Sequence, residues 1–327
     1  MKSKSVFKEY DNIIFTVNYY TELLGVLSIL SENQLAIKEA GIERKNSEYR
    51  DDVLDYFGEY KYNPVTLMLE LFSEQYYFNY DAPVSLFLHL EHKNTINRKS
   101  LCEDRKLIDK QKFNDFIKSI EEFAEVSNYN DFYRKHKTTY LKVIDNFIDD
   151  YKHYDPLTFL LTFLDIKTAN KYIVNFMLGI TNGNYGVNIK NNIYANLRPY
   201  RKSRYNDFPD FSYSPIYYTT LILHEFAHAF INPLIKGFNQ IINNINISKY
   251  DEILERFDYG DNLTVYIAET VIRAIECLYV KQQFPIEHEV YIQDNVKEGF
   301  ILIREVENIL ISKNKDSRLN EIINVFL

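Results

Sequence analysis

Residues 219–230 read TTLILHEFAHAF, an apolar run that contains two histidines and one glutamate. The HExxH pattern places His224 and His228 four residues apart, so on an α-helix both imidazoles lie on one face and can bind one metal ion. Glu225 follows about 100° round the helix, where its carboxylate reaches a water molecule on that metal. The stretch therefore predicts a helix with two zinc ligands and a catalytic base.

The neighbours of this motif are almost all apolar, which predicts a buried helix. Two imidazoles and a carboxylate inside a protein need partners, because an unpaired buried charge is costly. A metal ion supplies such a partner, and a hydrogen-bonded pair of core histidines is the alternative. We favour the metal, because the motif rarely arises by chance in a chain with only 7 histidines.

A catalytic zinc site usually has a third protein ligand and one open position. The metzincin pattern HExxHxxGxxH is excluded, because Ile231 and Leu234 stand where it requires glycine and histidine. The run 262–276, NLTVYIAETVIRAIE, has the pattern of an apolar helix with Glu269 at its centre. This carboxylate needs a strong partner, either zinc or Arg273 four residues further along the same face. We predict that Glu269 is the third zinc ligand.

Several other residues are weaker candidates for metal binding. The later His288 lies in a polar stretch, and His89 and His92 stand beside charged residues, so we interpret that pair as surface histidines. Weaker choices for the third ligand are Glu276, Glu252 and Glu255.

Composition is compatible with an enzyme. A chain of 327 residues that is 46% hydrophobic can bury a large core. The net charge of −8 has no basic block to offset it, which argues against nucleic acid as the main partner. Cys102 and Cys277 lie far apart without a CxxC neighbour, so we expect small core residues and not a zinc ribbon.

No segment has the pattern of a membrane span or a signal peptide. The basic N-terminus is followed by an apolar stretch that Tyr10, Asp11 and Asn12 interrupt, and no window approaches about 18 apolar residues. We therefore expect a cytoplasmic protein with no membrane span.

The first half of the chain has the periodicity of amphipathic helices. The segment 83–90 is ambiguous between strand and helix, and breaks are expected at 127–130 and at Asp155-Pro156. The predicted helices cover approximately 20–38, 48–60, 63–75, 110–126 and 130–151.

The pattern changes at 171–197. Residues 171–180 and 185–197 read as extended stretches joined by a turn at 181–184, which predicts a hairpin just before the HExxH helix. In zincins the strand before this helix forms a wall of the cleft, where an extended peptide can add as another strand. An ordinary sheet element of the core is the alternative.

Three stretches together resemble a known family. The string HEFAHAFINP at 224–233, the NGNYG turn at 182–186 and the AETVIRAI helix at 268–275 are similar to the bacterial family called domain of unknown function 4932, a gluzincin-like group of predicted metallopeptidases. The likeness is clearest over about 171–276.

This resemblance implies a thermolysin-like arrangement, with zinc ligands His224, His228 and Glu269 and with Glu225 as the base. The sequence departs from thermolysin in two ways. Glu269 follows His228 by 41 residues, a longer separation than in the commonest gluzincins, and the usual Glu-x-x-x-Asp ends in Arg273. A different acceptor must therefore orient a zinc-bound histidine.

The predicted reaction is zinc-assisted hydrolysis of a peptide or protein substrate. Glu225 takes a proton from water and delivers it to the leaving amine. Arg273 and Tyr185 are candidates for stabilising the oxyanion. The alternatives are a catalytically inactive zincin-like binding or regulatory protein, which has no chemical reason to keep Glu225, and a helical interaction protein with an accidental motif.

We expect an α+β, mostly helical fold of zincin-like type. A small sheet or hairpin at about 171–197 should lie beside the HExxH helix. Residues 1–165 would form a mainly helical region packed on a catalytic region, 166–327, or both would form one continuous domain.

Overall fold

A computed structural model of the chain forms two compact units, which are described separately. Unit 1 contains residues 1–153 and 169–213, and unit 2 contains 154–168 and 214–327. The structure describes residues 4–31, 48–76, 78–92, 108–167, 170–199, 209, 211, 214–257, 259–260, 262–312 and 315–327.

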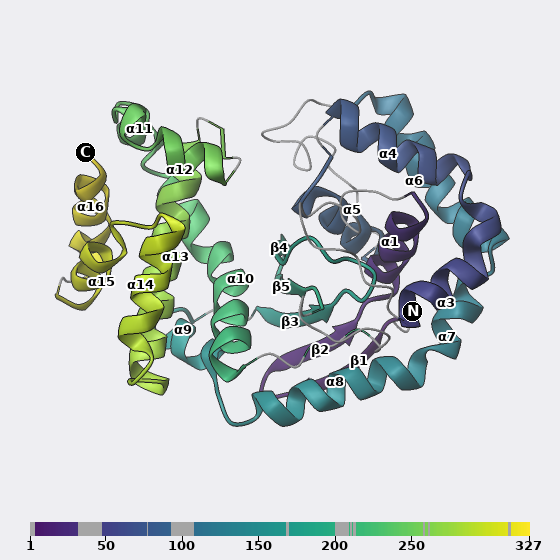
Figure 1. The fold of residues 1–327 in the computed structure, drawn as a ribbon, viewed down its shortest axis with the longest axis horizontal. Coiled ribbons are helices and arrows are strands. Elements are labelled where there is room, and N and C mark those ends of the chain that lie inside the picture. Colours follow the sequence, from purple (N-terminus) through teal and green to yellow (C-terminus); the bar gives the residue numbers. More distant parts are fainter. Residues whose placement is uncertain are drawn as a thin grey trace. The chain divides into compact units, whose positions relative to one another are not determined.

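Unit 1 is built on a five-stranded mixed sheet with the order β1-β2-β3-β5-β4 (Figure 1). Strands β2, β3 and β5 run parallel, and β1 and β4 pair antiparallel at the two edges. The strands are β1 (Val6–Tyr10), β2 (Ile13–Val17), β3 (Lys171–Phe176), β4 (Tyr185–Ile189) and β5 (Asn192–Leu197). The expected α+β class, mostly helical with a small sheet, is confirmed.

The strand pairing corrects the hairpin predicted for 171–197. The stretch 171–180 does not turn back onto its neighbour: β3 pairs in parallel with β5, and β4 lies on the far side of β5. The actual hairpin joins β4 to β5 through Lys190, whose φ of +55° suits a tight turn. The four residues 181–184 therefore lie in a longer connection to the outer strand. Which neighbour a strand chooses is decided by the whole sheet, so a local turn pattern is a weak guide.

Strands β1 and β2 form a second hairpin that the sequence patterns do not predict. The residues that interrupt the N-terminal apolar stretch form its turn: Asp11 and Asn12 both have positive φ, 45° and 66°. Two consecutive positive φ values are typical of a turn that matches the twist of the flanking strands. The polar interruption is thus a turn between two strands.

The two faces of this sheet have different cover. Helix α8 (Lys137–Tyr151) packs on one face, where the ring of Phe147 lies 6.0 Å from that of Phe15 and 4.9 Å from that of Phe176. On the opposite face α1 (Tyr19–Leu30) covers one end of the strands: the Asn175 amide of β3 donates to Thr21 of α1 at 3.1 Å.

The remaining helices of unit 1 largely follow the predicted periodicity. The ambiguous segment 83–90 is helical, as part of α5 (Asp81–Glu91). The expected break at 127–130 is present, with Asn128 at a φ of +54°. The others are α3 (Glu48–Phe57), the 3-10 turn η1 (Gly58–Tyr60), α4 (Pro64–Tyr76), α6 (Lys110–Val126) and α7 (Tyr129–Lys135).

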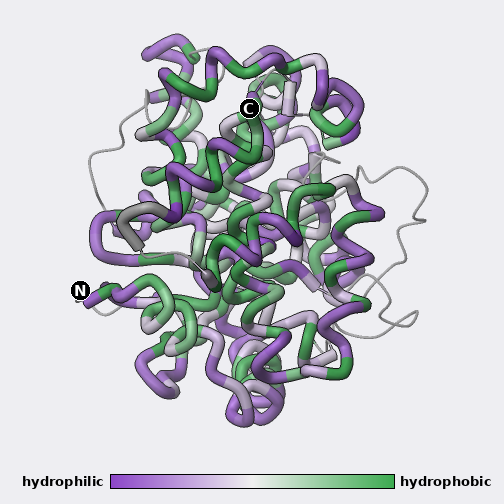
Figure 2. Tube along the Cα trace, turned by 90° about the vertical axis from the view of Figure 1, so that its left-hand side faces the viewer, coloured by the Kyte–Doolittle hydropathy of each residue, from purple (hydrophilic) through white to green (hydrophobic). Residues whose placement is uncertain are grey.

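Unit 2 is helical throughout the part that the structure describes. Helices α10 and α13 pack against each other, and α13 also packs on α15. The tube in Figure 2 alternates between green and purple along the helices, as expected when each buries one side. The elements are α9 (Pro156–Leu164), α10 (Pro215–Lys236), α11 (Asn239–Ile242), the 3-10 turn η3 (Ile247–Lys249), α12 (Asp251–Arg256), α13 (Leu263–Gln283), α14 (His288–Glu298), α15 (Ile303–Ser312) and α16 (Lys315–Phe326).

The division of the chain differs from the boundary expected near residue 165. Strands β3 to β5 belong to unit 1, because β2 and β3 share one hydrogen-bonded ladder, whereas α9 belongs to unit 2. Among the described helices, none is long and apolar enough to cross a membrane. The cytoplasmic location and the absence of a nucleic-acid partner stay predictions. Cys277 is a buried core residue, as expected, and Cys102 lies outside the described residues.

Candidate metal centre

Two long helices of unit 2 carry the predicted metal ligands. Helix α10 begins at Pro215, whose fixed φ suits the first turn, and the side chain of Ser214 caps it by accepting from the Tyr217 amide. One turn apart on this helix, His224 and His228 have ring centroids 4.7 Å from each other. The HExxH segment is thus helical, as predicted.

Glu269 of α13 lies opposite the two histidines. Its Oε2 is 3.4 Å from His224 Nε2, and its Oε1 is 3.5 Å from His228 Nε2. One ligand atom from each of the three residues lies within 4.8 Å of the others. Their side chains remain 13 to 19% exposed, so the group is not completely buried. The structure therefore brings together the three residues that the sequence predicts as ligands.

The donor set suits zinc. Two imidazole nitrogens and one carboxylate are ligands that catalytic zinc sites use, with a fourth position left for water or substrate. Among the described residues, these three make the group of histidine, cysteine and acidic side chains with metal-binding spacing. Tetrahedral zinc with metal–ligand distances of about 2.0–2.2 Å places its ligand atoms about 3.3–3.6 Å apart. The distances of 3.4 and 3.5 Å from Glu269 to the two imidazoles match this spacing.

Glu276 fixes the orientation of the first histidine. It is 3% exposed, and its Oε1 lies 2.5 Å from His224 Nδ1. The Tyr291 hydroxyl donates to the other carboxylate oxygen. If Nδ1 donates to this carboxylate, Nε2 keeps its lone pair on the side that faces Glu269. Glu276, a weaker candidate for the third ligand in the sequence, therefore lies on the Nδ1 side of His224, whereas Glu269 lies on the Nε2 side.

Electrostatics in this cluster favour a histidine–carboxylate pair. Burial acts to raise the pKa of Glu269, but His224 and His228 outweigh it and lower that pKa to about 2. Burial acts to lower the pKa of His224, and the charges of Glu269 and Glu276 raise it well above its usual value. Without a metal, a proton takes the place of a cation between these groups.

Glu225 lies on the buried side of the HExxH helix. It is 5% exposed, and burial raises its pKa. It makes no hydrogen bond with any described residue. A buried carboxyl group beside two histidines, with an elevated pKa, is the environment expected of a group that exchanges protons.

Arg273 mainly contacts α14 and Phe300, a residue that follows the C-terminus of α14. Its Nη1 donates to Asn295 Oδ1 at 2.8 Å and to Glu298 Oε2 at 3.3 Å. Its guanidinium carbon lies 4.2 Å from the centroid of the Phe300 ring. Arg273 Nε is 4.0 Å from Glu269 Oε2. The alternative partner of Glu269, Arg273, is therefore within 4.0 Å, but the two histidines that could share a metal ion with Glu269 lie nearer.

The other candidate residues lie elsewhere or have other partners. In unit 1 the Tyr185 hydroxyl donates to Asn182 at 2.6 Å, and a role in catalysis stays a prediction. In unit 2, His288 bonds to the buried Glu307 at 2.7 Å. Glu252 and Glu255 are exposed on α12. His89 of unit 1 bonds to the Ser85 carbonyl, and His92 to Tyr194.

Sequence reasoning missed two residues of this cluster, Tyr291 and Asn295. They lie on α14, in a polar segment in which no spacing or motif singles them out. A signal was available only for the role of Glu276. A buried HExxH histidine needs an acceptor for its second nitrogen, and Glu276 follows Glu269 by seven residues, two turns along the same face.

The fold and the site define a mostly helical α+β protein with a histidine–histidine–glutamate group of metal-binding spacing. The profile of a family described as a domain of unknown function (DUF4932) matches residues 9–324. The chain belongs to this family. No curated protein and no solved structure matches the chain significantly.

Proposed function

We propose that the chain is a zinc metallopeptidase that hydrolyses peptide bonds in peptide or protein substrates. The observation that carries the proposal is the convergence of His224, His228 and Glu269 next to Glu225. We assign α10 as the HExxH helix and α13 as the third-ligand helix of a zincin-like, gluzincin-type catalytic fold. Zinc, when bound to these residues, polarises a scissile carbonyl and lowers the pKa of water.

In this proposal the buried carboxylate of Glu225 moves the protons. It takes one proton from the attacking water as the new C–O bond forms and the carbonyl becomes a tetrahedral oxyanion. It then delivers this proton to the amine, which leaves as the C–N bond breaks and the carbonyl re-forms. Glu276 holds His224 through Nδ1, which keeps Nε2 free as a ligand atom.

The oxyanion needs a donor, and Arg273 is the candidate we retain. Its guanidinium is held beside Glu269 by Asn295, so it is a fixed positive charge close to the ligand group. Such preorganised donors stabilise charge that develops in the transition state.

The test is Glu225→Gln, with zinc content and hydrolysis of a mixed peptide pool measured on the same samples. Glu225 is a base in this proposal and not a ligand, so the variant should retain one zinc per chain while the rate falls by roughly 10² to 10⁴. Glu289→Gln is the matched control, because Glu289 is an exposed glutamate of the same unit that bonds to Arg304.

Two results would overturn the proposal. Wild-type protein that binds no zinc removes the metal site altogether. Wild-type protein that binds one zinc but cleaves nothing in the pool favours the alternative, an inactive zincin-like binding or regulatory protein.

A further inference from the structure

Helix α10 carries a third polar side chain on the face of its two histidines. Asn232 follows His228 by four residues, as His228 follows His224. Residues four apart on a helix lie one above the other, so these three side chains occupy successive turns of one face. Asn232 is exposed and lies one turn before the end of α10 at Lys236. The face that presents the candidate ligands therefore continues with an amide.

The side chain of Asn232 contacts one nitrogen of the His228 ring. Its Oδ1 lies 3.3 Å from Nδ1. An amide oxygen can only accept, so the ring nitrogen is the donor, and a neutral imidazole that holds its proton on Nδ1 keeps a lone pair on Nε2. It is this Nε2 that lies 3.5 Å from Glu269 Oε1. The contact with Asn232 thus selects the form of His228 that can bind a metal ion through Nε2.

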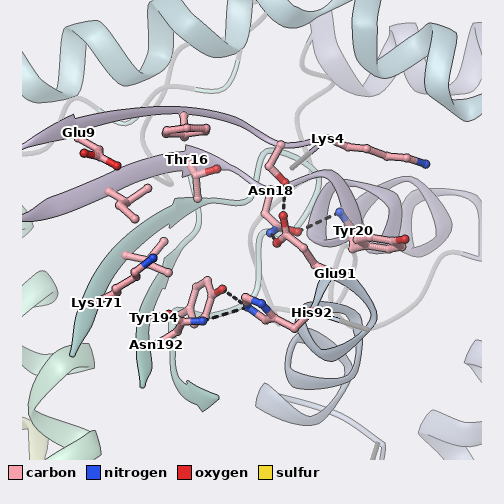
Figure 3. Close-up of a pocket in the computed structure, with 14 residues that line it drawn as sticks. Lys4, Glu9, Thr16, Asn18, Tyr20, Glu91, His92, Lys171, Asn192 and Tyr194 are labelled. Atoms are coloured by element: carbon pink, nitrogen blue, oxygen red, sulfur yellow. Dashed lines mark hydrogen bonds between the residues drawn. The ribbon is translucent and has the colours of Figure 1, made fainter. Parts of the chain in front are cut away.

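His92 of unit 1 shows the opposite arrangement. Its Nε2 is 2.5 Å from the Tyr194 hydroxyl and 3.3 Å from the Asn192 amide nitrogen, as drawn in Figure 3. The Asn192 nitrogen can only donate, so Nε2 is the acceptor and its lone pair is engaged. An asparagine beside a histidine therefore has no fixed effect. The atom that the amide offers, and the ring nitrogen that it contacts, decide whether the ring can be a ligand.

Asn232 has no other hydrogen-bond partner in the described part of the chain. Neither its oxygen nor its amide nitrogen makes a further bond there. Asparagine is also a poor helix former, because its side chain competes with the backbone for hydrogen bonds. Helix stability alone would favour alanine or leucine at this exposed position. The contact with His228 is therefore the use of this asparagine that the described residues show.

The two histidines of α10 have partners of different strength at Nδ1. Glu276 holds His224 with a carboxylate that is 3% exposed and 2.5 Å away. Asn232 contacts His228 with a neutral oxygen, in an exposed position and at 3.3 Å. Hydrogen bonds to charged acceptors are shorter and stronger than those to neutral ones. The ring of His228 is therefore held less tightly, and removal of its partner should have the smaller effect.

We propose that Asn232 is a positioning residue of the metal centre, whose side-chain oxygen binds the Nδ1 proton of His228 and so directs Nε2 of this ring to the metal ion. The proposal rests on the proposed zinc site and adds to it the group that orients the second histidine. In this role Asn232 acts only through His228 and is not itself a ligand.

The experiment compares Asn232→Leu and Asn232→Asp with wild type in the full chain. Leucine has a similar branched shape but no acceptor. Zinc affinity, measured by competition with a chelator, should fall about tenfold in Asn232→Leu, the lower end of the range for an outer partner of a ligand. Asn232→Asp should restore at least the wild-type affinity, because a carboxylate oxygen accepts the same proton. A purely structural asparagine would not be replaced in this way, because aspartate is no better a helix former.

Spectra of the zinc-loaded protein with isotope-labelled histidines test the hydrogen bond itself. In wild type and in Asn232→Asp, the Nδ1 proton of His228 should exchange slowly with water, because an acceptor holds it. In Asn232→Leu this proton should exchange faster, while that of His224, which Glu276 holds, should not change. This measurement separates the hydrogen bond from the general attraction between zinc and the new charge of Asn232→Asp, because such an attraction does not protect a proton.

Asn244→Leu is the matched control. Asn244 is an exposed asparagine of the same unit, and its amide donates to the Gln240 carbonyl at 2.8 Å and not to a histidine. This variant should keep the zinc affinity and the His228 signal of wild type. The free energy of unfolding of zinc-free Asn232→Leu should be no lower than that of wild type, because leucine is the better helix former at an exposed position.

Three results would overturn the proposal. Unchanged zinc affinity in Asn232→Leu means that His228 needs no such partner. A loss that Asn232→Asp does not restore, or that Asn244→Leu shares, has a cause other than the acceptor. Unchanged exchange of the His228 proton in Asn232→Leu means that the oxygen does not hold it. In each case wild type still binds zinc and the proposed function stands, whereas wild type that binds no zinc overturns both proposals.

Discussion

Two glutamates of low exposure, one in each unit, differ in the groups that surround them. Glu22 of α1 is fully buried and accepts from neutral donors, the Tyr49 hydroxyl at 2.6 Å and the Leu178 amide at 2.7 Å. Glu269 of α13 faces His224 and His228. Burial raises the pKa of Glu22 to about 7, whereas the two histidines lower that of Glu269 to about 2.

The difference separates a structural carboxyl group from a candidate metal ligand. Glu22 ties α1 to α3 and to the connection that follows β3, and no cation compensates its burial in the pKa balance. Glu269 has two neighbours that can share either a proton or a metal ion with it. A buried glutamate alone is therefore a poor indicator of a metal site, and the histidine partners are what distinguish Glu269.

The largest expected effect comes from removing the charge of each glutamate in turn. Glu269→Gln should reduce zinc affinity by more than the roughly 10–100-fold that an outer partner of a ligand is worth, because it replaces a ligand. Glu22→Gln, the matched control in unit 1, should leave zinc binding unchanged. Elemental analysis and competition with a chelator measure both. Equal zinc affinity in the two variants would remove Glu269 from the ligand set.

The next effect concerns the pH dependence of stability. A carboxyl group whose folded pKa is raised keeps its proton in the folded state at a pH where the unfolded chain, at about 4.5, has lost it. The raised pKa of Glu22 therefore contributes stability that is fully present below about pH 4.5 and is lost as the pH rises towards 7. Over this pH range the contribution of Glu22 to the free energy of unfolding changes by about 3 kcal/mol.

Glu22→Gln should remove this dependence, because glutamine has no proton to lose. The free energy of unfolding of wild type, relative to the variant, should therefore fall by about 3 kcal/mol between pH 4.5 and 7.5. Denaturant unfolding at several pH values measures it. A difference that is constant with pH would show that Glu22 does not titrate in this range.

The sequence predicts the ligand group better than the sheet. HExxH spacing and the apolar pattern around Glu269 are local features of single helices, and helix geometry fixes which residues share a face. The three residues of metal-binding spacing could thus be named from two segments. The helices at 48–57 and 110–126 follow from the same periodicity.

Strand pairing and the residues behind the ligands depend on contacts between distant segments. Asp11 and Asn12 read as a polar interruption until β2 is known to pair with β1. The parallel pairing of β3 with β5 has no local signal at all. Tyr291 matters only because α14 places its hydroxyl on Glu276, a contact between two helices that a single sequence does not encode in any spacing.

The smallest of these effects distinguishes two buried histidine–glutamate pairs of unit 2. Glu276 bonds to His224, which belongs to the ligand group, and Glu307 bonds to His288, which does not. Glu276→Gln should lower zinc affinity by about 10–100-fold, because the carboxylate no longer fixes the ring and its basic nitrogen. Glu307→Gln removes a similar buried carboxylate and should leave zinc affinity unchanged.

Comparing Glu276→Gln with Glu307→Gln separates a loss of the orientation of His224 from a general loss of structure. Both glutamates are nearly inaccessible, 3% and 2% exposed, so each substitution removes a buried charge from a bonded histidine. If both variants lose zinc affinity equally, the effect of Glu276→Gln is one of stability, and the comparison fails. If only Glu276→Gln weakens zinc binding, the carboxylate acts through His224. Tyr291→Phe should then lower the affinity by a smaller factor, since it removes one hydrogen bond from the carboxylate and leaves the carboxylate itself in place.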